Sequence, residues 1–250
     1  MIIVNDLVKT YPGNCKALDG ISFKIEPGEV CGYLGANGAG KSTTVKILTG
    51  ILNSDAGSVL INDIDVFKRP KDVKQIVGYV PESGALFESL TPFDFLEFVC
   101  SIYGIDKKIY VKRIYDFAEL FDLSKEIKAP MSSFSRGMKQ KVLIISSLIH
   151  NPEIIFWDEP LGGLDYNTNV LIRDLITDLS AGGKTFFYCS HILDIVEKVC
   201  TKVIILKSGK VVYDDNIRSG SPSLEEIFKK YIDASDKRDK AAEIYRNINS

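Results

Sequence analysis

One motif constrains the fold of this chain more than any other feature, the run Gly35-Ala36-Asn37-Gly38-Ala39-Gly40-Lys41-Ser42-Thr43. It fits the pattern G-x-x-x-x-G-K-[ST] and follows the compact apolar run 30–34, which predicts a buried strand. Glycines there let backbone N–H groups turn inward around phosphate oxygens, and a helix beginning at Lys41 directs its positive end toward them. We therefore expect a phosphate-binding loop between a central strand and a helix.

The positions of this loop have distinct expected roles. We expect Lys41 to place a mobile positive charge on the outer phosphates of a nucleotide. Ser42 is expected to offer its hydroxyl to Mg²⁺, and Thr43 to reach phosphate oxygens. The remaining positions predicted to bind the nucleotide are Gly35, Asn37, Gly38, Ala39 and Gly40.

Two acidic residues, Asp158 and Glu159, directly follow the apolar run 154–157, which predicts another buried strand. Sheets of α/β proteins bind their ligands at the carboxyl ends of the strands. We expect Asp158 to hold the magnesium shell and Glu159 to polarise the attacking water as general base. Taken alone, the two acids also fit an ordinary capping role in the following loop; their combination with the phosphate loop favours catalysis.

Short β-branched runs alternate with helical stretches along the chain, which predicts an α/β fold with helices on the faces of a sheet. Buried central strands are predicted at 30–34, 154–157, 185–189 and 203–206, and half-exposed antiparallel strands at 2–8, 21–25 and 58–66. Thr91-Pro92 predicts a helix that lasts until Gly104, and a second helix is expected over 108–121. Residues 91–150 carry no convincing strand pattern, so we interpret them as a helical insertion.

Composition excludes several classes of protein. The 250 residues are 45% hydrophobic and 26% charged, which is typical of a globular chain and not of a disordered, collagen-like or coiled-coil one. The net charge of −2 gives no basic field for nucleic acid, so no nucleic-acid partner is expected. No apolar run reaches the ~18–20 residues of a membrane-spanning helix. Because residues 1–6 also lack the pattern of a secretory signal, we expect a cytoplasmic protein.

Several further motifs, in the same order along the chain, resemble those of the ATP-binding subunit of ABC transporters, and the similarity covers nearly the whole chain. The segment Phe134-Ser135-Arg136-Gly137-Met138-Lys139-Gln140 stands where that family carries its signature L-S-G-G-Q. Leu164-Asp165 resembles the D-loop, Ser190-His191 the switch histidine, and Tyr79-Val80-Pro81-Glu82 the Q-loop. Tyr11 occupies the position of an aromatic residue that stacks on adenine.

The resemblance implies a P-loop NTPase (RecA-like) core with an antiparallel β subdomain and an inserted α-helical subdomain. Residues 1–250 would then form a single ABC ATPase domain. Its core with the β subdomain would comprise residues 1–90 and 151–213, its helical subdomain 91–150, and its C-terminal helix and tail 214–250. The implied cofactors are ATP and Mg²⁺, the implied catalytic residues are Glu159 and His191, and the metal would lie among Ser42, Glu82 and Asp158.

The same resemblance implies a head-to-tail homodimer, in which each ATP lies between the phosphate loop of one chain and the signature of the other. Ser135, Gly137 and Asp165 would then contact the nucleotide across the interface. The form of the signature and the ending 223–228 look most like exporter ATPases that serve a separate permease of the ABC-2 type, on the inner face of the cell membrane. Such systems move drugs, antibiotics, peptides or lipid-type substrates. The groove for the permease is expected to involve Phe87, Leu90, Phe93 and Phe95, although some of these also fit a core role.

Two departures from the family pattern stand out. Arg136 replaces the first glycine of the signature, so its side chain must point away from the phosphates or add positive charge near them. Glu82 replaces the usual glutamine and adds negative charge beside Asp158 and Glu159. An alternative function, an ABC ATPase of a cytoplasmic assembly such as iron–sulfur cluster biogenesis, shares every catalytic motif and differs only in its partner.

Overall fold

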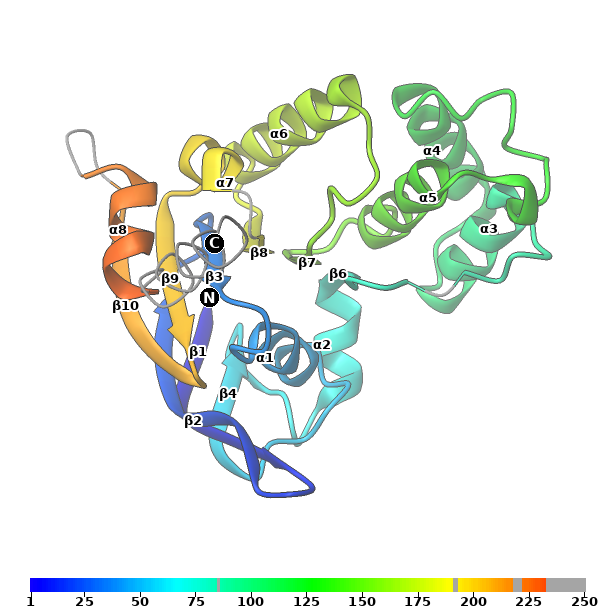
Figure 1. The fold of residues 1–250 in the computed structure, drawn as a ribbon. Helices are drawn as coiled ribbons and strands as arrows, with labels where there is room; N and C mark the ends of the chain where they lie inside the picture. Colours follow the sequence, from blue (N-terminus) through cyan, green and yellow to red (C-terminus); the bar gives the residue numbers. More distant parts are fainter. Residues whose placement is uncertain (85, 191–192, 218–221, 233–250) are drawn as a thin grey trace, which may run out of the picture.

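The computed structural model describes residues 1–84, 86–190, 193–217 and 222–232, and within these ranges the strands form two sheets (Figure 1). One sheet is antiparallel, with the order β2-β1-β4-β5. Its strands are β1 (Ile2–Tyr11), β2 (Cys15–Ile25), β4 (Ala56–Ile61) and β5 (Ile64–Asp65). The α/β class with an antiparallel part is therefore confirmed.

The central sheet has the order β10-β9-β3-β8-β7-β6, and every neighbouring pair is parallel except β10 with β9. Its strands are β3 (Val30–Gly35), β6 (Val77–Val80), β7 (Ile154–Asp158), β8 (Thr185–Cys189), β9 (Lys202–Lys207) and β10 (Lys210–Asn216). The four central strands predicted from compact apolar runs are all present. Because β3 is flanked by β9 and β8, the loop that follows β3 emerges from the middle of the sheet.

The helices of the described residues connect and cover these strands. They are α1 (Lys41–Leu48), α2 (Pro70–Ile76), α3 (Pro92–Ile102), α4 (Lys107–Leu120), α5 (Arg136–Leu148), α6 (Tyr166–Ala181), α7 (Leu193–Val199) and α8 (Leu224–Tyr231), with a short 3-10 helix at Met131–Ser133. In the described parts of the chain, no helix combines the length and the apolar character that crossing a bilayer requires.

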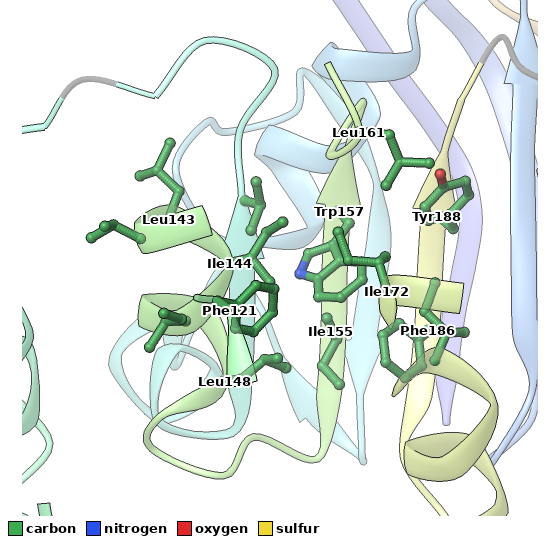
Figure 2. Close-up of a cluster of buried hydrophobic side chains, with 14 of the residues drawn as sticks. Phe121, Leu143, Ile144, Leu148, Ile155, Trp157, Leu161, Ile172, Phe186 and Tyr188 are labelled. Atoms are coloured by element: carbon green, nitrogen blue, oxygen red, sulfur yellow. The ribbon is translucent and has the colours of Figure 1, made fainter. Parts of the chain in front are cut away.

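Strand β7 shows how the core is built. Its side chains alternate between two faces of the sheet, so that Ile155 and Trp157 join one buried cluster while Ile154 and Phe156 join the other. Figure 2 shows the first cluster, in which Trp157 lies between side chains of α5 and of β8. The Trp157 indole N–H, fully buried, donates to the Ser147 hydroxyl at 3.0 Å and so fixes α5 against the strand. A strand buried on both faces ends at the two acids.

Residues 91–150, all of which the structure describes, hold α3, α4 and α5 and no strand, as predicted for a helical insertion. These helices lie together at one side of the molecule, reached from β6 (Figure 1). The first one begins as predicted, because Thr91 accepts a hydrogen bond from the Asp94 N–H while the Asp94 carboxylate accepts from the Thr91 N–H.

The single strand predicted at 58–66 is wrong. Asn62 and Asp63 adopt positive φ angles of 46° and 62°, which form a two-residue turn of the hairpin type, and the chain reverses from β4 into β5. Strand β6 was not predicted, because its four residues are too few to show a periodicity. Strand β10 continues to Asn216, beyond residue 213.

Candidate functional site

A pocket of 340 Å³ lies where β3 and β7 end and α1 begins. This is the carboxyl edge of the parallel sheet, the usual ligand site of such folds. Its lining residues come from the β1–β2 hairpin, the phosphate-loop motif and the ends of β6 and β7: Tyr11, Cys15, Ala17, Asn37, Gly38, Gly40, Lys41, Ser42, Thr43, Glu82, Asp158 and Glu159. The structure thus brings most of the predicted nucleotide and metal residues together.

Glycine is required in this loop at Gly40. Its φ of 113° is strained for other residues, and a Cβ there would lie 2.5 Å from the carbonyl oxygen of Ala17. The Lys41 ammonium, almost fully buried, donates to the carbonyl oxygens of Gly35 at 2.8 Å and of Ala36 at 3.4 Å. The loop therefore holds a cation folded over its own carbonyls, at the N-terminus of α1 where anions are favoured.

Two predicted positions, Gly35 and Ala39, do not line the pocket. Gly35 ends β3, and a Cβ on it would lie 2.5 Å from the carbonyl oxygen of Leu206. The Ala39 side chain is buried in the core beneath the loop, and its N–H donates to the Ala36 carbonyl oxygen at 3.0 Å. Both residues therefore support the shape of the loop from below.

The pocket holds an acidic cluster around Asp158. Asp158 is 1% exposed, and its Oδ1 has no hydrogen-bond partner among the described residues. Burial raises the pKa of Asp158, the negative charges of Glu82 and Glu159 raise it further, and the Ser42 hydroxyl and Lys41 oppose them. Ser42 also donates to Glu82 Oε2 at 3.4 Å. A buried, unpartnered carboxylate oxygen beside a second carboxylate and a hydroxyl is the oxygen donor set that Mg²⁺ prefers.

The backbone of Glu159 is unusual. Its φ of 52° lies in the left-handed region, which costs a residue other than glycine about 1 kcal/mol. Its N–H donates to the Cys189 carbonyl oxygen at 3.0 Å, and its own carbonyl accepts from the Gly162 N–H at 3.4 Å. These bonds hold the turn after β7, so that Glu159 faces the pocket next to Asp158. No feature of the sequence indicated this conformation.

Tyr11 lies at the mouth of the pocket, 37% exposed, with its hydroxyl 3.3 Å from Thr43 Oγ1. Two lining residues, Cys15 and Ala17, were missed by the sequence analysis. Cys15 pairs with Tyr11 across the β1–β2 hairpin, so the strand register places it at the same mouth. The turn at residues 12–14 is the only sequence feature that could have indicated this pairing of Tyr11 with Cys15, and it matches no binding motif.

The signature residues lie elsewhere in the same chain. Ser135 caps α5 and accepts from the Met138 N–H at 3.2 Å, while Gly137 lies so close to the next loop that a Cβ would meet the Gly163 carbonyl oxygen at 2.6 Å. Asp165 caps α6 and accepts from the N–H and the hydroxyl of Thr168, which lower its pKa. Ser135, Gly137 and Asp165 do not line the nucleotide pocket, and His191 lies outside the described residues.

The structure also shows which way the Arg136 side chain points. A Cβ on Gly163 would lie 3.3 Å from its Cδ and Cγ, and one on Gly162 would lie 3.4 Å from its Nη2. The arginine side chain therefore packs over the Gly162–Gly163 loop of its own chain. This loop runs from Glu159 to Asp165. The Arg136 side chain therefore connects the start of α5 to the segment between Glu159 and Asp165.

Comparison with known proteins identifies this arrangement. The model of the ABC transporter family matches residues 18–162. The ABC transporter ATP-binding protein NatA of Bacillus subtilis is 36% identical over 206 residues, which cover 82% of this chain and 83% of NatA. The linearmycin resistance ATP-binding protein LnrL of the same organism is 33% identical over 212 residues, covering 85% of this chain and 68% of LnrL.

Two solved structures are similar over most of the chain. The ATP-binding subunit of an ABC transporter has a TM-score of 0.82 at 28% identity and covers all of both chains. The dimeric structure of MJ0796, a bacterial ABC transporter cassette, has a TM-score of 0.82 at 26% identity, covering 88% of this chain and all of the other.

Proposed function

The chain belongs to the ATP-binding proteins of ABC transporters and is an ATPase, and from that premise we propose that it powers export through a separate transmembrane permease. The observation that carries the catalytic part is the pocket in which the phosphate loop faces Asp158 and Glu159. Exported substrates of the drug, antibiotic, peptide or lipid type remain our proposal, supported by the similarity to LnrL, a linearmycin resistance protein.

In this proposal the charged and aromatic residues of the pocket have distinct tasks. Lys41 leaves the carbonyls of Gly35 and Ala36 and binds the outer phosphates, while backbone N–H groups at the start of α1 hold the others. Ser42, Glu82 and Asp158 hold Mg²⁺, which neutralises phosphate charge when bound. Glu159 polarises the attacking water as general base, and Tyr11 stacks on adenine. The role of His191, a hydrogen bond to the γ-phosphate, stays a prediction.

We further propose a head-to-tail homodimer. Ser135, Gly137 and Asp165 lie outside the pocket of their own chain, so they can reach a nucleotide only from a second copy. The similarity to a dimeric ABC transporter cassette at 26% identity supports this arrangement. The Ser135 hydroxyl and the N–H groups at the start of α5 would then complete the phosphate cage. ATP would stabilise the dimer, and hydrolysis would release it.

An exposed apolar strip on α3 and the segment just before it supports a permease contact. Phe87, Phe98 and Ile102 are 60%, 50% and 58% exposed, and the rings of Phe87 and Phe98 meet edge to face at 6.5 Å between centroids. Exposed apolar area of this kind marks interaction sites. Among the residues expected in the groove, Phe87 is exposed, whereas Phe95 is buried in the core, which favours the core role for Phe95. Leu90 and Phe93 are partly buried against the same core.

The subdomain boundaries also remain part of the proposal: a core with the β subdomain at 1–90 and 151–213, a helical subdomain at 91–150, and a C-terminal helix and tail at 214–250. The presence of α3, α4 and α5 between residues 91 and 150 supports the helical subdomain. The permease of ABC-2 type would hold the chain as a cytoplasmic, peripheral subunit on the inner face of the cell membrane. No nucleic-acid partner is proposed.

The partner is tested by purifying tagged Glu159→Gln protein with ATP and Mg²⁺ from detergent-solubilised native membranes. We expect a multi-span protein to co-purify, and to be lost from the same protein carrying Phe98→Ser. The matched control is Ile109→Ser, which removes a comparably exposed residue from α4. Recovery of soluble scaffold proteins alone would replace the transport function by the cytoplasmic assembly function.

A further inference from the structure

A second cavity, of 350 Å³, lies at the other end of β7. Its lining residues come from α4, the end of α5, α6 and the segments that lead into β7 and β8: Arg113, Phe117, Leu148, Ile149, Asn151, Pro152, Ile155, Leu175, Leu179 and Lys184. Most of this wall is apolar; Leu148 of α5 and Ile155 of β7, both of which line it, are labelled in Figure 2. The volume is that of a small-molecule site.

Two cationic side chains line this cavity, one from α4 and one from the residue before β8, and both bond to the turn that follows α5. The Arg113 Nη1 donates to the Ile149 carbonyl oxygen at 2.9 Å. The Lys184 Nζ donates to the carbonyl oxygen of Asn151 at 3.3 Å and to its side-chain Oδ1 at 2.8 Å. The two side chains are thus fixed to carbonyls two residues apart on the same turn, and both line the cavity.

Neither cation forms an ion pair with a carboxylate among the described residues. The acid whose charge acts on Lys184 is Glu153, and its carboxylate accepts a hydrogen bond from the Asn62 amide at 2.6 Å. Burial lowers the pKa of Lys184, which means that its charge lacks part of its solvation. An anion in the cavity would supply that missing interaction and would be held by charge-assisted hydrogen bonds.

We propose that this cavity binds a small amphipathic carboxylate, with its head between Arg113 and Lys184 and its alkyl or aryl body against Phe117, Leu175 and Leu179. The charge pair selects the carboxylate, and the wall selects the apolar body. The ligand would touch α4 of the helical insertion and α6 of the core together.

The site is separate from the nucleotide pocket. The cavity reaches β7 at Ile155 and the residues before it, whereas Asp158 at the other end of the strand belongs to the nucleotide pocket. Five residues of strand span about 13 Å. Binding here therefore does not require an intact phosphate loop, and the proposal stands or falls independently of the proposed function.

Isothermal titration calorimetry tests the proposal with three probes kept below any micelle concentration: decanoate, decanol and acetate. We expect decanoate to bind the wild-type chain at one site, and both decanol and acetate to bind at least about tenfold more weakly, because each lacks half of the recognised chemistry. Decanol binding as tightly as decanoate, or no decanoate binding at millimolar concentration, would overturn the proposal.

Three variants locate the site. Lys184→Gln and Arg113→Gln are each expected to weaken decanoate binding about tenfold or more, because each removes one charge-assisted hydrogen bond. Lys112→Gln, on the exposed face of the same helix as Arg113, is the matched control and should bind as wild type does. Circular dichroism and ATP affinity report whether the variants are folded. Unchanged decanoate affinity in a folded Lys184→Gln chain would contradict the assignment, as would its loss in Lys41→Ala.

Discussion

Replacing Asp158 by asparagine should make the nucleotide-free chain more stable while it destroys the proposed metal site. The Asp158 carboxylate is almost fully buried, its Oδ1 lacks a partner among the described residues, and Glu82 and Glu159 add negative charge nearby. A buried polar group without a partner costs ~1–3 kcal/mol, and more when it is charged. Asparagine keeps the shape and removes the charge.

We therefore expect Asp158→Asn to raise the free energy of unfolding by about 1–3 kcal/mol at pH 7. Each kcal/mol should raise the Tm by ~2–4 °C. The pH dependence has a definite sign. The folded chain raises the pKa of Asp158 above its ordinary value of 3.8, so the folded state binds that proton more tightly than the unfolded state. Wild-type stability thus falls as the pH rises through this range, and the advantage of the variant is full at pH 7 and shrinks toward pH 4.

Urea denaturation of nucleotide-free protein at pH 7.5 and at pH 5 measures the difference. Asp165→Asn is the control with the opposite sign, because hydrogen bonds from Thr168 lower the pKa of Asp165 and favour its ionised form. With ATP and Mg²⁺ the order should reverse, since the wild-type chain, which keeps the metal site, gains more stability from the bound pair. An Asp158→Asn chain that is less stable than wild type at pH 7.5 without nucleotide would show that the buried Asp158 carboxylate does not destabilise the empty pocket.

Three other substitutions test separate parts of the structure. Ser147→Ala should lower the free energy of unfolding by about 1–3 kcal/mol in urea titrations, because the buried Trp157 N–H loses its acceptor; an unchanged midpoint would contradict this. Lys41→Ala should weaken ATP binding at least about tenfold by calorimetry, and equal affinity would remove the phosphate-loop role. Tyr11→Ala should raise the Kd for ATP about fivefold through lost stacking, with Tyr11→Phe close to wild type; a large loss in Tyr11→Phe would instead assign the role to the bond with Thr43.

Elements with a strong local signal were predictable from the sequence. The strand before the phosphate loop, the strand before Asp158 and the helix that starts at Thr91 all have compact apolar runs or capping residues, and all are present. The hairpin at Asn62 and Asp63 was missed, although two adjacent polar residues of the turn-forming type interrupt the alternation of a single strand.

Within the site, the motifs predicted many of the residues that line the pocket. They did not predict the tertiary contacts that fix the conformations of these residues. The pocket lining includes Lys41, Ser42 and Asp158, as the motifs indicated. The left-handed backbone of Glu159 depends on its bond to the Cys189 carbonyl, which is 30 residues away in sequence and has no local pattern. The contact of Arg136 with the loop at Gly163 is likewise tertiary.

The head-to-tail arrangement is tested most directly by mixing two inactive variants. Lys41→Ala removes the phosphate loop and leaves the signature, whereas Ser135→Arg blocks the signature and leaves the phosphate loop. In a mixed head-to-tail dimer, one of the two sites receives an intact phosphate loop from one chain and an intact signature from the other. A head-to-tail dimer should let an equimolar mixture recover up to about a quarter of the wild-type ATPase rate while each variant alone stays inactive. A mixture no more active than its separate components would contradict it.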